Sequence, residues 1–277
     1  MVADIEYREL HEPVEFERVI DLEIQVWGIE PRDAVPSSML RALEHGGGLI
    51  NGAWAGDELV GMSVMYPVPV NGRLSLWSHM AGVRPDYQQY GIGRGLKLHQ
   101  WAWALERGYD EIRWTFDPLL RGNANFNLHK LGATFGSYLI NFYGTMTDEI
   151  NASGLPSDRV EAVWRLNEAR VIALASANGQ REANEAKATK ATKATKATDH
   201  PALLERDKQG QPRSVGTADG RAARYRVQLP PTLKTLENET TLAWRLALRE
   251  TLTSAFAAGY YAADFHTDDS EYILHKR

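Results

Sequence analysis

The chain has 277 residues, of which 43% are hydrophobic and 24% are charged, so it has the composition of a globular protein with one large domain or two unequal ones. Its net charge of -5 gives no general attraction for phosphate backbones or anionic lipids, so we expect no nucleic-acid partner and no membrane partner. The lack of cysteine excludes disulfides, thiolate metal ligands and a cysteine nucleophile, and we expect no bound metal. The lack of cysteine also fits a reducing compartment, so we expect a cytoplasmic protein, and residues 1–10 carry no apolar run typical of a signal peptide.

Residues 1–150 are expected to form one domain in which helical and strand patterns alternate. Two apolar runs flank Gly56-Asp57, which indicates a hairpin. A helix between two strands predicts that these strands are parallel neighbours. In chain order, the predicted elements are a strand from Ile5, a helix over 14–27, strands over 49–54, 59–67 and 74–83, a helix over 91–108, a strand over 112–116, a helix over 123–131 and a strand over 134–143.

The helix over 91–108 has a wide apolar arc that is expected to lie on a sheet. Its polar residues Arg94, Lys97 and Gln100 are expected on the opposite side. The arc consists of Ile92, Leu96, Leu98, Trp101, Trp103 and Leu105.

Residues 151–277 are expected to form a smaller α/β lobe with a flexible insertion at about 180–218. This insertion repeats Lys-Ala-Thr four times over 187–198 and is short of large apolar groups, so it is not expected to fold alone. The remaining predicted elements are strands over 160–166 and 225–229, a helix over 236–258, and strands over 260–265 and 272–274.

Residues 83–95 join the third strand of the first domain's meander to the long helix through a turn that contains Gly91 and Gly93. The N–H groups at the start of a helix have no intrahelical partners, and the helix dipole adds a positive potential there. Glycine lets the backbone approach an anion closely, and Arg94 offers a charge-assisted contact. The segment therefore predicts a phosphate site, although a tight turn without a ligand also explains the two glycines.

Three kinds of phosphate loop compete for this turn. A Walker loop requires Gly-Lys-Ser/Thr after four variable residues, and the turn has no such string. A dinucleotide fingerprint needs a third glycine where Leu96 stands, and it follows the first strand of a parallel sheet. The string Gln88-Gln89-Tyr90-Gly91-Ile92-Gly93 resembles the pyrophosphate-binding motif of GNAT acyltransferases: Gln or Arg, two variable residues, Gly, one variable residue, then Gly or Ala.

Further strings extend the resemblance over about residues 5–145 and narrow it to a bacterial GNAT subgroup with an added C-terminal lobe. They are Ser78-His79-Met80 and the segments 114–119 and 125–133. The resemblance implies an α/β fold, with a GNAT-type mixed sheet flanked by helices and a smaller C-terminal α/β lobe. It also implies acetyl-CoA or another acyl-CoA as co-substrate and a small amine as acceptor. The residues that it implies in coenzyme binding are Ala81, Gly82, Val83, Gln88, Gln89, Tyr90, Gly91, Ile92, Gly93, Arg94 and Asn123.

Two titratable residues are the candidate catalytic groups. Acyl transfer from a thioester to an amine needs a positioned carbonyl, an acceptor for the amine proton and stabilisation of developing charge. His79 is expected on a strand face shared with Trp77 and Ala81 and suits the proton acceptor; a core histidine hydrogen-bonded between strands is the alternative. Asp117 ends the next strand before Pro118, where it is expected to orient His79 or bind a substrate ammonium, with turn capping as the alternative.

The helix over 123–131 departs from the family pattern at one position. Many GNAT enzymes have a tyrosine there that protonates the leaving thiolate, whereas this chain has Leu128. His129 or Tyr143 is a candidate substitute, or the thiolate leaves without a dedicated acid, because a thiol has a pKa of about 8.5. Asn123 is expected to contact the coenzyme, although helix capping alone explains its presence.

Two functions of different classes follow from this reading. The leading one is an acyl-CoA-dependent N-acyltransferase with an acetyl or succinyl donor, because some relatives acylate amino acids, including with succinyl groups. The alternative is a catalytically silent protein that binds or senses coenzyme A. Leu128 favours the alternative, and the His79 and Asp117 pair favours the enzyme. The acyl chain, the acceptor and the oligomeric state, a homodimer included, stay open.

Overall fold

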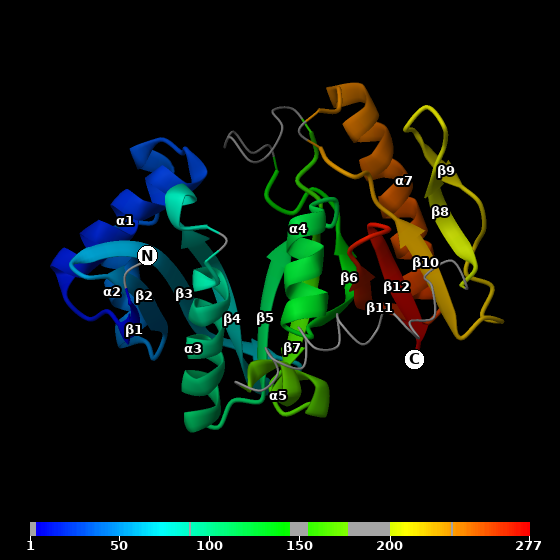
Figure 1. Ribbon diagram of the computed structural model, residues 1–277. Helices are drawn as coiled ribbons and strands as arrows, with labels where there is room; N and C mark the ends of the chain where they lie inside the picture. Colours follow the sequence, from blue (N-terminus) through cyan, green and yellow to red (C-terminus); the bar gives the residue numbers. More distant parts are fainter. Residues whose placement is uncertain (1–3, 89, 145–154, 177–199, 234) are drawn as a thin grey trace. The chain divides into compact units, whose positions relative to one another are not determined.

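The structure is a computed structural model that describes residues 4–88, 90–144, 155–176, 200–233 and 235–277. It divides into two compact units (Figure 1). The N-terminal unit takes in the described residues up to Trp114, and the C-terminal unit takes in those from Thr115 onwards. The division falls within strand β5 (Glu111–Phe116). That residues 1–150 and 151–277 form separate domains stays a prediction.

The N-terminal unit is built on a mixed sheet with the strand order β1-β2-β3-β4-β5. The strands β1 to β4 pair antiparallel in succession, whereas β4 and β5 are parallel. This confirms both the predicted meander and the predicted parallel pair on either side of the long helix. The strands before β5 are β1 (Ile5–Glu9), β2 (Leu49–Ala55), β3 (Glu58–Val70) and β4 (Arg73–Val83).

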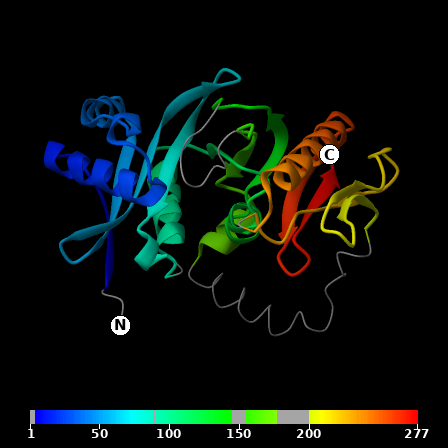
Figure 2. The ribbon, with the colours of Figure 1, turned by 90° about the horizontal axis from the view of Figure 1, so that it is seen from above.

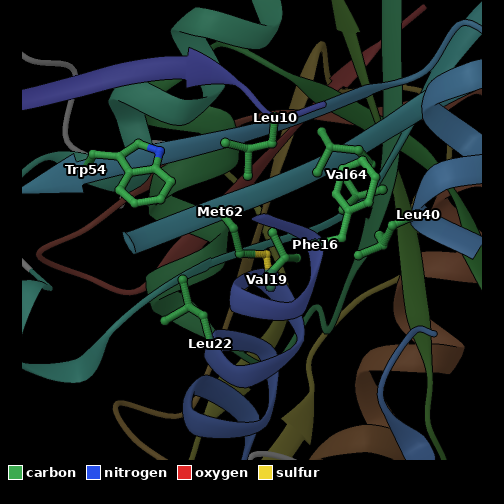
Figure 3. Packing of buried hydrophobic residues seen from close by; sticks show 9 residues of the cluster. Leu10, Phe16, Val19, Leu22, Leu40, Trp54, Met62 and Val64 are labelled. Carbon is green, nitrogen blue, oxygen red and sulfur yellow. The ribbon is translucent and has the colours of Figure 1, made fainter. Parts of the chain in front are cut away.

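Helices cover both faces of this sheet (Figure 2). Helix α1 (Pro13–Trp27) and helix α2 (Ser37–His45) pack on one face, where Phe16, Leu40 and Met62 share a core cluster (Figure 3). Helix α3 (Ile92–Glu106) packs on the other face through a separate cluster. Burying a side chain such as Phe16 fully contributes about 1.5–3 kcal/mol, so these clusters hold the helices to the sheet. Helix α2 was not among the predicted elements.

The C-terminal unit contains a second mixed arrangement of strands, in the order β7-β6-β11-β12-β10-β8-β9. Strands β8 and β10 are parallel, and the other neighbours are antiparallel. Helix α7 packs on β6, β9 and β11. The mixed α/β class expected from the sequence is therefore confirmed. The elements are α4 (Arg121–Ala124), η3 (Asn125–Lys130), β6 (Thr134–Leu139), β7 (Arg159–Arg165), α5 (Ala169–Ala175), β8 (Ala202–Arg206), β9 (Pro212–Ser214), β10 (Arg224–Gln228), α7 (Asn238–Ala257), β11 (Tyr260–His266) and β12 (Glu271–Lys276).

Strands β8 and β9 lie in the segment at about 180–218 that was predicted to be a flexible insertion. Leu203 and Leu204 of β8 are buried, and β8 pairs with both β10 and β9. A short segment with two leucines does not form a core by itself, but it becomes ordered when an existing strand offers hydrogen bonds and an apolar surface. The expected insertion is therefore wrong from residue 200 onwards, and its repeat at 187–198 lies outside the described residues.

Within the described ranges, no helix is both long and apolar enough to cross a lipid bilayer.

Candidate active site

The predicted phosphate turn lies between the end of β4 and the start of α3. A short 3-10 helix, η2 (Pro85–Tyr87), leads from β4 to Gly91, which is the N-cap residue of α3. Gly91 has a φ of 81°, a left-handed conformation that favours glycine, and no side chain caps the helix. The N–H groups of the first helical turn therefore depend on something other than a capping side chain for their hydrogen bonds.

Side chains of the turn itself hold its shape. The Arg84 guanidinium bonds to Asp86 at 2.7 and 3.1 Å and to Glu58 at 3.2 Å, and it lies 4.5 Å from the centre of the Tyr87 ring. The bond to Asp86 is the main reason why the pKa of Arg84 is raised. Gln88 donates its side-chain amide to the Val83 carbonyl at 3.1 Å. These contacts stabilise the conformation of the turn, and the Gln88 side-chain amide takes part in one of them.

The two glycines of the turn leave room around the helix start. A Cβ atom added at Gly91 meets nothing within 4 Å. A Cβ atom at Gly93 meets only the Val83 side chain, at an ordinary contact distance of 3.7 Å. Gly95 differs, because a Cβ atom there comes within 2.1 Å of the Tyr7 ring. A side chain at position 95 would therefore displace the Tyr7 ring, whereas packing does not explain Gly93.

The other predicted coenzyme residues of the turn differ in exposure. Tyr90 is exposed, whereas the Ile92 side chain is buried in the cluster under α3, so only the Ile92 backbone is available to a ligand. Arg94 is half-buried, and burial lowers its pKa. Gln89 lies outside the described residues.

Strand β4 carries a bulge at His79. Ser78 pairs with Met65 and Met80 pairs with Val64, so His79 is an extra residue between two consecutive pairs. Ser78 contacts helix α3, whereas Met80 packs against the core cluster of α1 on the opposite face. A bulge of this kind re-aims the side chains around it. The simple alternation that placed His79, Trp77 and Ala81 on one face is therefore wrong at this point.

The rest of β4 also divides between the two faces. A Cβ atom at Gly82 comes within 3.0 Å of Trp27 and 3.1 Å of Val26, so this glycine lets the end of α1 approach the strand. Val83 packs on the α3 side, and Ala81 is exposed. The coenzyme-binding roles predicted for these three residues stay predictions.

The His79 ring is exposed, and in the described part of the chain it has no hydrogen bond, only a tilted contact with Tyr66 at 6.2 Å between ring centres. The alternative of a core histidine hydrogen-bonded between strands is therefore not what the structure has. The surrounding protein nevertheless removes enough water to lower the pKa of His79 below its ordinary value. A neutral imidazole, which can accept a proton, is thus favoured at neutral pH.

Asp117 is buried in the C-terminal unit, where its carboxylate is bound by other residues of that unit. Arg245 donates to both of its oxygens, at 3.2 and 2.6 Å, and Arg159 lies 3.9 Å away. The Leu119 N–H donates to Asp117 Oδ1 at 2.9 Å, which is the geometry of a capped turn. These contacts favour the turn-capping interpretation, and a catalytic role for Asp117 stays a prediction.

The segment around Asn123 and Leu128 begins earlier than expected. Helix α4 has Leu120 as its N-cap residue, so the exposed Asn123 lies inside the helix and does not cap it. The following η3 is a π-helix, a form that is frequent at functional sites, and Leu128 in it is fully buried. His129 Nδ1 lies 3.6 Å from Asp264 Oδ1, and the Tyr143 hydroxyl lies 3.0 Å from that of Thr115.

Comparisons with known proteins bear on the same part of the chain. The model of the Acetyltransferase (GNAT) family matches residues 10–133. Residues 10–133 are a GNAT acetyltransferase domain. The match begins just after β1 and runs through the phosphate turn and η3.

Solved structures similar to the chain include a putative GNAT-family acetyltransferase from Desulfovibrio desulfuricans, at 16% identity and a TM-score of 0.48 over 59% of this chain and 99% of that one. Another is yncA, a putative acetyltransferase from Salmonella typhimurium with its cofactor acetyl-CoA. It has 15% identity and a TM-score of 0.47 over 59% of this chain and 95% of that one. A third is an N-acetyltransferase from Staphylococcus aureus, at 11% identity and a TM-score of 0.48 over 60% of this chain and 100% of that one. No curated protein sequence matches the chain.

The GNAT domain contains a buried polar network, and the sequence pattern predicted two of its residues on the wrong side of α3. Lys97 and Gln100 were expected on the polar side of α3, but both are buried, with 4% and 0% of their surface exposed. Lys97 Nζ donates to Ser78 Oγ at 2.8 Å, and Ser78 Oγ donates to Gln100 Oε1 at 3.1 Å. Gln100 Nε2 donates to Ser63 Oγ at 2.8 Å, and Ser63 in turn bonds to Asn51. The available signal was the presence of polar residues within strands that are otherwise apolar.

Burial lowers the pKa of Lys97 in this network from 10.5 to about 7. In the unfolded chain this amine keeps its proton up to about pH 10.4. Between these two values the unfolded state binds more protons than the folded state, so the free energy of unfolding rises with pH. The cost of burying the protonated amine is fully present below about pH 7 and disappears as the pH rises.

We therefore expect Lys97→Met to remove this pH dependence. Between pH 7 and 10 the wild-type free energy of unfolding should rise relative to that of Lys97→Met by on the order of 1 kcal/mol per pH unit. Urea unfolding of both proteins at several pH values measures the difference. Parallel pH profiles for the two proteins would show that Lys97 does not titrate in this range. The same substitution at the exposed Lys208 is the control.

In the described residues, no cluster of three histidine, aspartate and glutamate side chains is arranged to hold a metal ion.

Proposed function

We propose that the GNAT domain binds an acyl-CoA at the turn from Gln88 to Arg94 and transfers the acyl group to a small amine. The acyl group proposed is acetyl or succinyl, and the acceptor is an amino acid or a similar amine. The observation that carries the proposal is the start of α3. Gly91 is its N-cap residue and offers no capping side chain, and the space for a Cβ atom beside Gly93 is not filled by other described parts of the protein. The pyrophosphate of the coenzyme supplies the negative charge that such a helix start favours.

The chemistry follows from the order of elements along β4. A coenzyme held by its pyrophosphate at the end of β4 extends its pantetheine arm back along the strand, towards the bulge at His79. The amine nitrogen attacks the thioester carbonyl, the carbon–sulfur bond breaks, and the amine proton passes to His79. The lowered pKa of His79 keeps its ring neutral and ready for that proton.

The leaving thiolate receives no dedicated acid in this proposal. Leu128 stands where the family pattern has a tyrosine, and its side chain carries no proton to give. A thiol with a pKa of about 8.5 is a tolerable leaving group, so water is sufficient to protonate the thiolate.

A second candidate function is a catalytically silent protein that binds or senses coenzyme A. Leu128 is the observation that favours it. Both candidates share the coenzyme site and differ only in whether an amine is acylated. The exposed His79 with its lowered pKa supports the enzyme.

The substitution His79→Gln tests the proposed proton acceptor. It keeps a polar side chain of similar reach, so coenzyme affinity should stay within about threefold, while kcat should fall by roughly a hundredfold, as is typical when a general base is lost. The deficit should shrink at alkaline pH, because the amine substrate then loses its proton without help. Calorimetric titration with coenzyme A and steady-state kinetics from pH 6 to 9 measure the two effects.

The control for this test is His266→Gln, which changes a histidine in the C-terminal unit. A folded His79→Gln protein with wild-type kcat across the whole pH range would leave water as the proton acceptor.

A further inference from the structure

Lys97 links the two parallel strands of the GNAT domain. Its side chain extends from the second turn of α3, is 4% exposed, and donates to Ser78 Oγ of β4 at 2.8 Å. Its Nζ also lies 4.0 Å from the centre of the Trp114 ring of β5. One amine thus contacts both strands, through a hydrogen bond on one side and a cation–π contact on the other.

These contacts lie where the two strands separate. Strand β4 pairs with β5 at Leu76–Ile112 and Trp77–Arg113, and in the described part of the chain the ladder ends there. Ser78 and Trp114 are the next residues along their strands. Lys97 therefore contacts both strands at the apex of a fork, the point just beyond Trp77–Arg113 where β4 and β5 are no longer paired. Its hydrogen-bond partner Ser78 is one residue before the bulge at His79.

Packing alone does not account for a lysine at this position. A buried ammonium loses its hydration, and an apolar side chain of similar length avoids that cost. The rest of the network shows what the lysine is arranged to do. Ser78 Oγ donates its own proton to Gln100, so its oxygen is left to accept a bond from Lys97. Gln100 extends the chain of bonds to Ser63 of β3, which ties the fork to the neighbouring strand.

We propose that Lys97 is a positioning residue that fixes the spacing of β4 and β5 at the apex of the fork. Through Ser78 it sets the backbone of His79 and Met80, against which the thioester carbonyl must lie for acyl transfer. This inference rests on the proposed function, because only a coenzyme arm that enters the fork makes its geometry matter for turnover. Lys97 itself contacts no substrate in this account.

The first test measures the fork in the free protein, without any activity. Lys97→Met keeps the length of the side chain and removes its donor. Hydrogen exchange followed by mass spectrometry should then show at least about tenfold faster exchange in peptides that cover 76–83, with no change in peptides that cover β1 and β2. Unchanged exchange over 76–83 in a folded Lys97→Met protein would overturn the inference. Lys208→Met, at an exposed site, is the matched control.

The second test separates positioning from binding. Coenzyme A should bind Lys97→Met within about threefold of the wild-type affinity, because the phosphate turn is unaltered. In contrast, kcat with acetyl-CoA should fall by on the order of ten- to a hundredfold, the scale typical of a small misplacement of reacting groups. Equal kcat for the folded variant and the wild type would overturn the inference.

Ser78→Ala provides an independent variant if Lys97→Met does not fold. It removes the acceptor, so it should accelerate exchange over 76–83 and lower kcat in the same direction. If both single variants fold, the double variant should be no slower than the slower single one, because the two residues act through one bond. Additive losses would contradict a shared role.

Failure of the inference is distinct from failure of the proposed function. A wild-type protein that does not bind coenzyme A would refute the proposed function, and the exchange measurement would still decide whether Lys97 holds the fork. Transfer by the wild type together with wild-type exchange and kcat in both folded variants would refute the inference alone.

Discussion

Gly93→Val should weaken coenzyme A binding by about 1,000-fold while the protein stays folded. A pyrophosphate at the start of α3 accepts charge-assisted hydrogen bonds from backbone N–H groups, each contributing about 1.5–3 kcal/mol. A side chain at position 93 occupies the space of the anion, and the loss of two or three such bonds amounts to about 4 kcal/mol, which corresponds to about 1,000-fold. Calorimetric titration with coenzyme A measures the affinity.

The folded state is expected to tolerate this substitution. A Cβ atom at Gly93 meets only Val83 at 3.7 Å, and Gly93 is not among the glycines with a positive φ. Thermal unfolding of Gly93→Val should therefore resemble that of the wild type. Ala102→Val, on the exposed side of the same helix, is the matched control and should bind coenzyme A normally. Wild-type affinity in a folded Gly93→Val protein would refute the assignment of the phosphate site.

Asp117→Asn should destabilise the C-terminal unit by about 3–5 kcal/mol. Asp117 and Arg245 are 6% and 5% exposed and form a two-bonded ion pair. Removing one charge of a buried pair leaves the other without compensation, which is far more costly than replacing both partners by apolar groups. Denaturant unfolding measures the loss, and Asp117→Leu combined with Arg245→Met should recover much of it.

Asp268→Asn, at an exposed position, is the control and should leave stability nearly unchanged. An Asp117→Asn protein that unfolds like the wild type but has lost turnover would contradict this structural role. That result would instead support the catalytic role expected from the sequence.

The sequence predicted the elements that local pattern determines. Two apolar runs separated by Gly56-Asp57 specify a hairpin, and Gly91 before an amphipathic segment specifies a helix start, so β2, β3 and α3 lie where expected. The turn between β4 and α3 was predictable for the same reason, because its signal is a string of adjacent residues, and its role in phosphate binding stays a prediction. The family match over residues 10–133 covers that same string.

Features that depend on partners distant in the sequence were not predictable in this way. The sequence pattern predicts Lys97 on the solvent side of α3. It does not show that folding brings Ser78 and Trp114 to the Lys97 amine. The bulge at His79 arises from the register between β3 and β4, which periodicity within β4 does not reveal. The ion pair of Asp117 was likewise not predictable, because its partner Arg245 lies far along the chain. Strand β8 was missed because its order comes from β10.

The central claim, transfer of an acyl group from a coenzyme A thioester to a small amine, is tested most directly by an assay of the intact protein. Acetyl-CoA and succinyl-CoA are offered with a panel of D- and L-amino acids, and free thiol and N-acylated product are measured together. We predict amine-dependent thiol release that matches the product one to one and is lost in Gly93→Val. Coenzyme A binding without amine-dependent release for any donor, or release that Gly93→Val leaves unchanged, would contradict the claim.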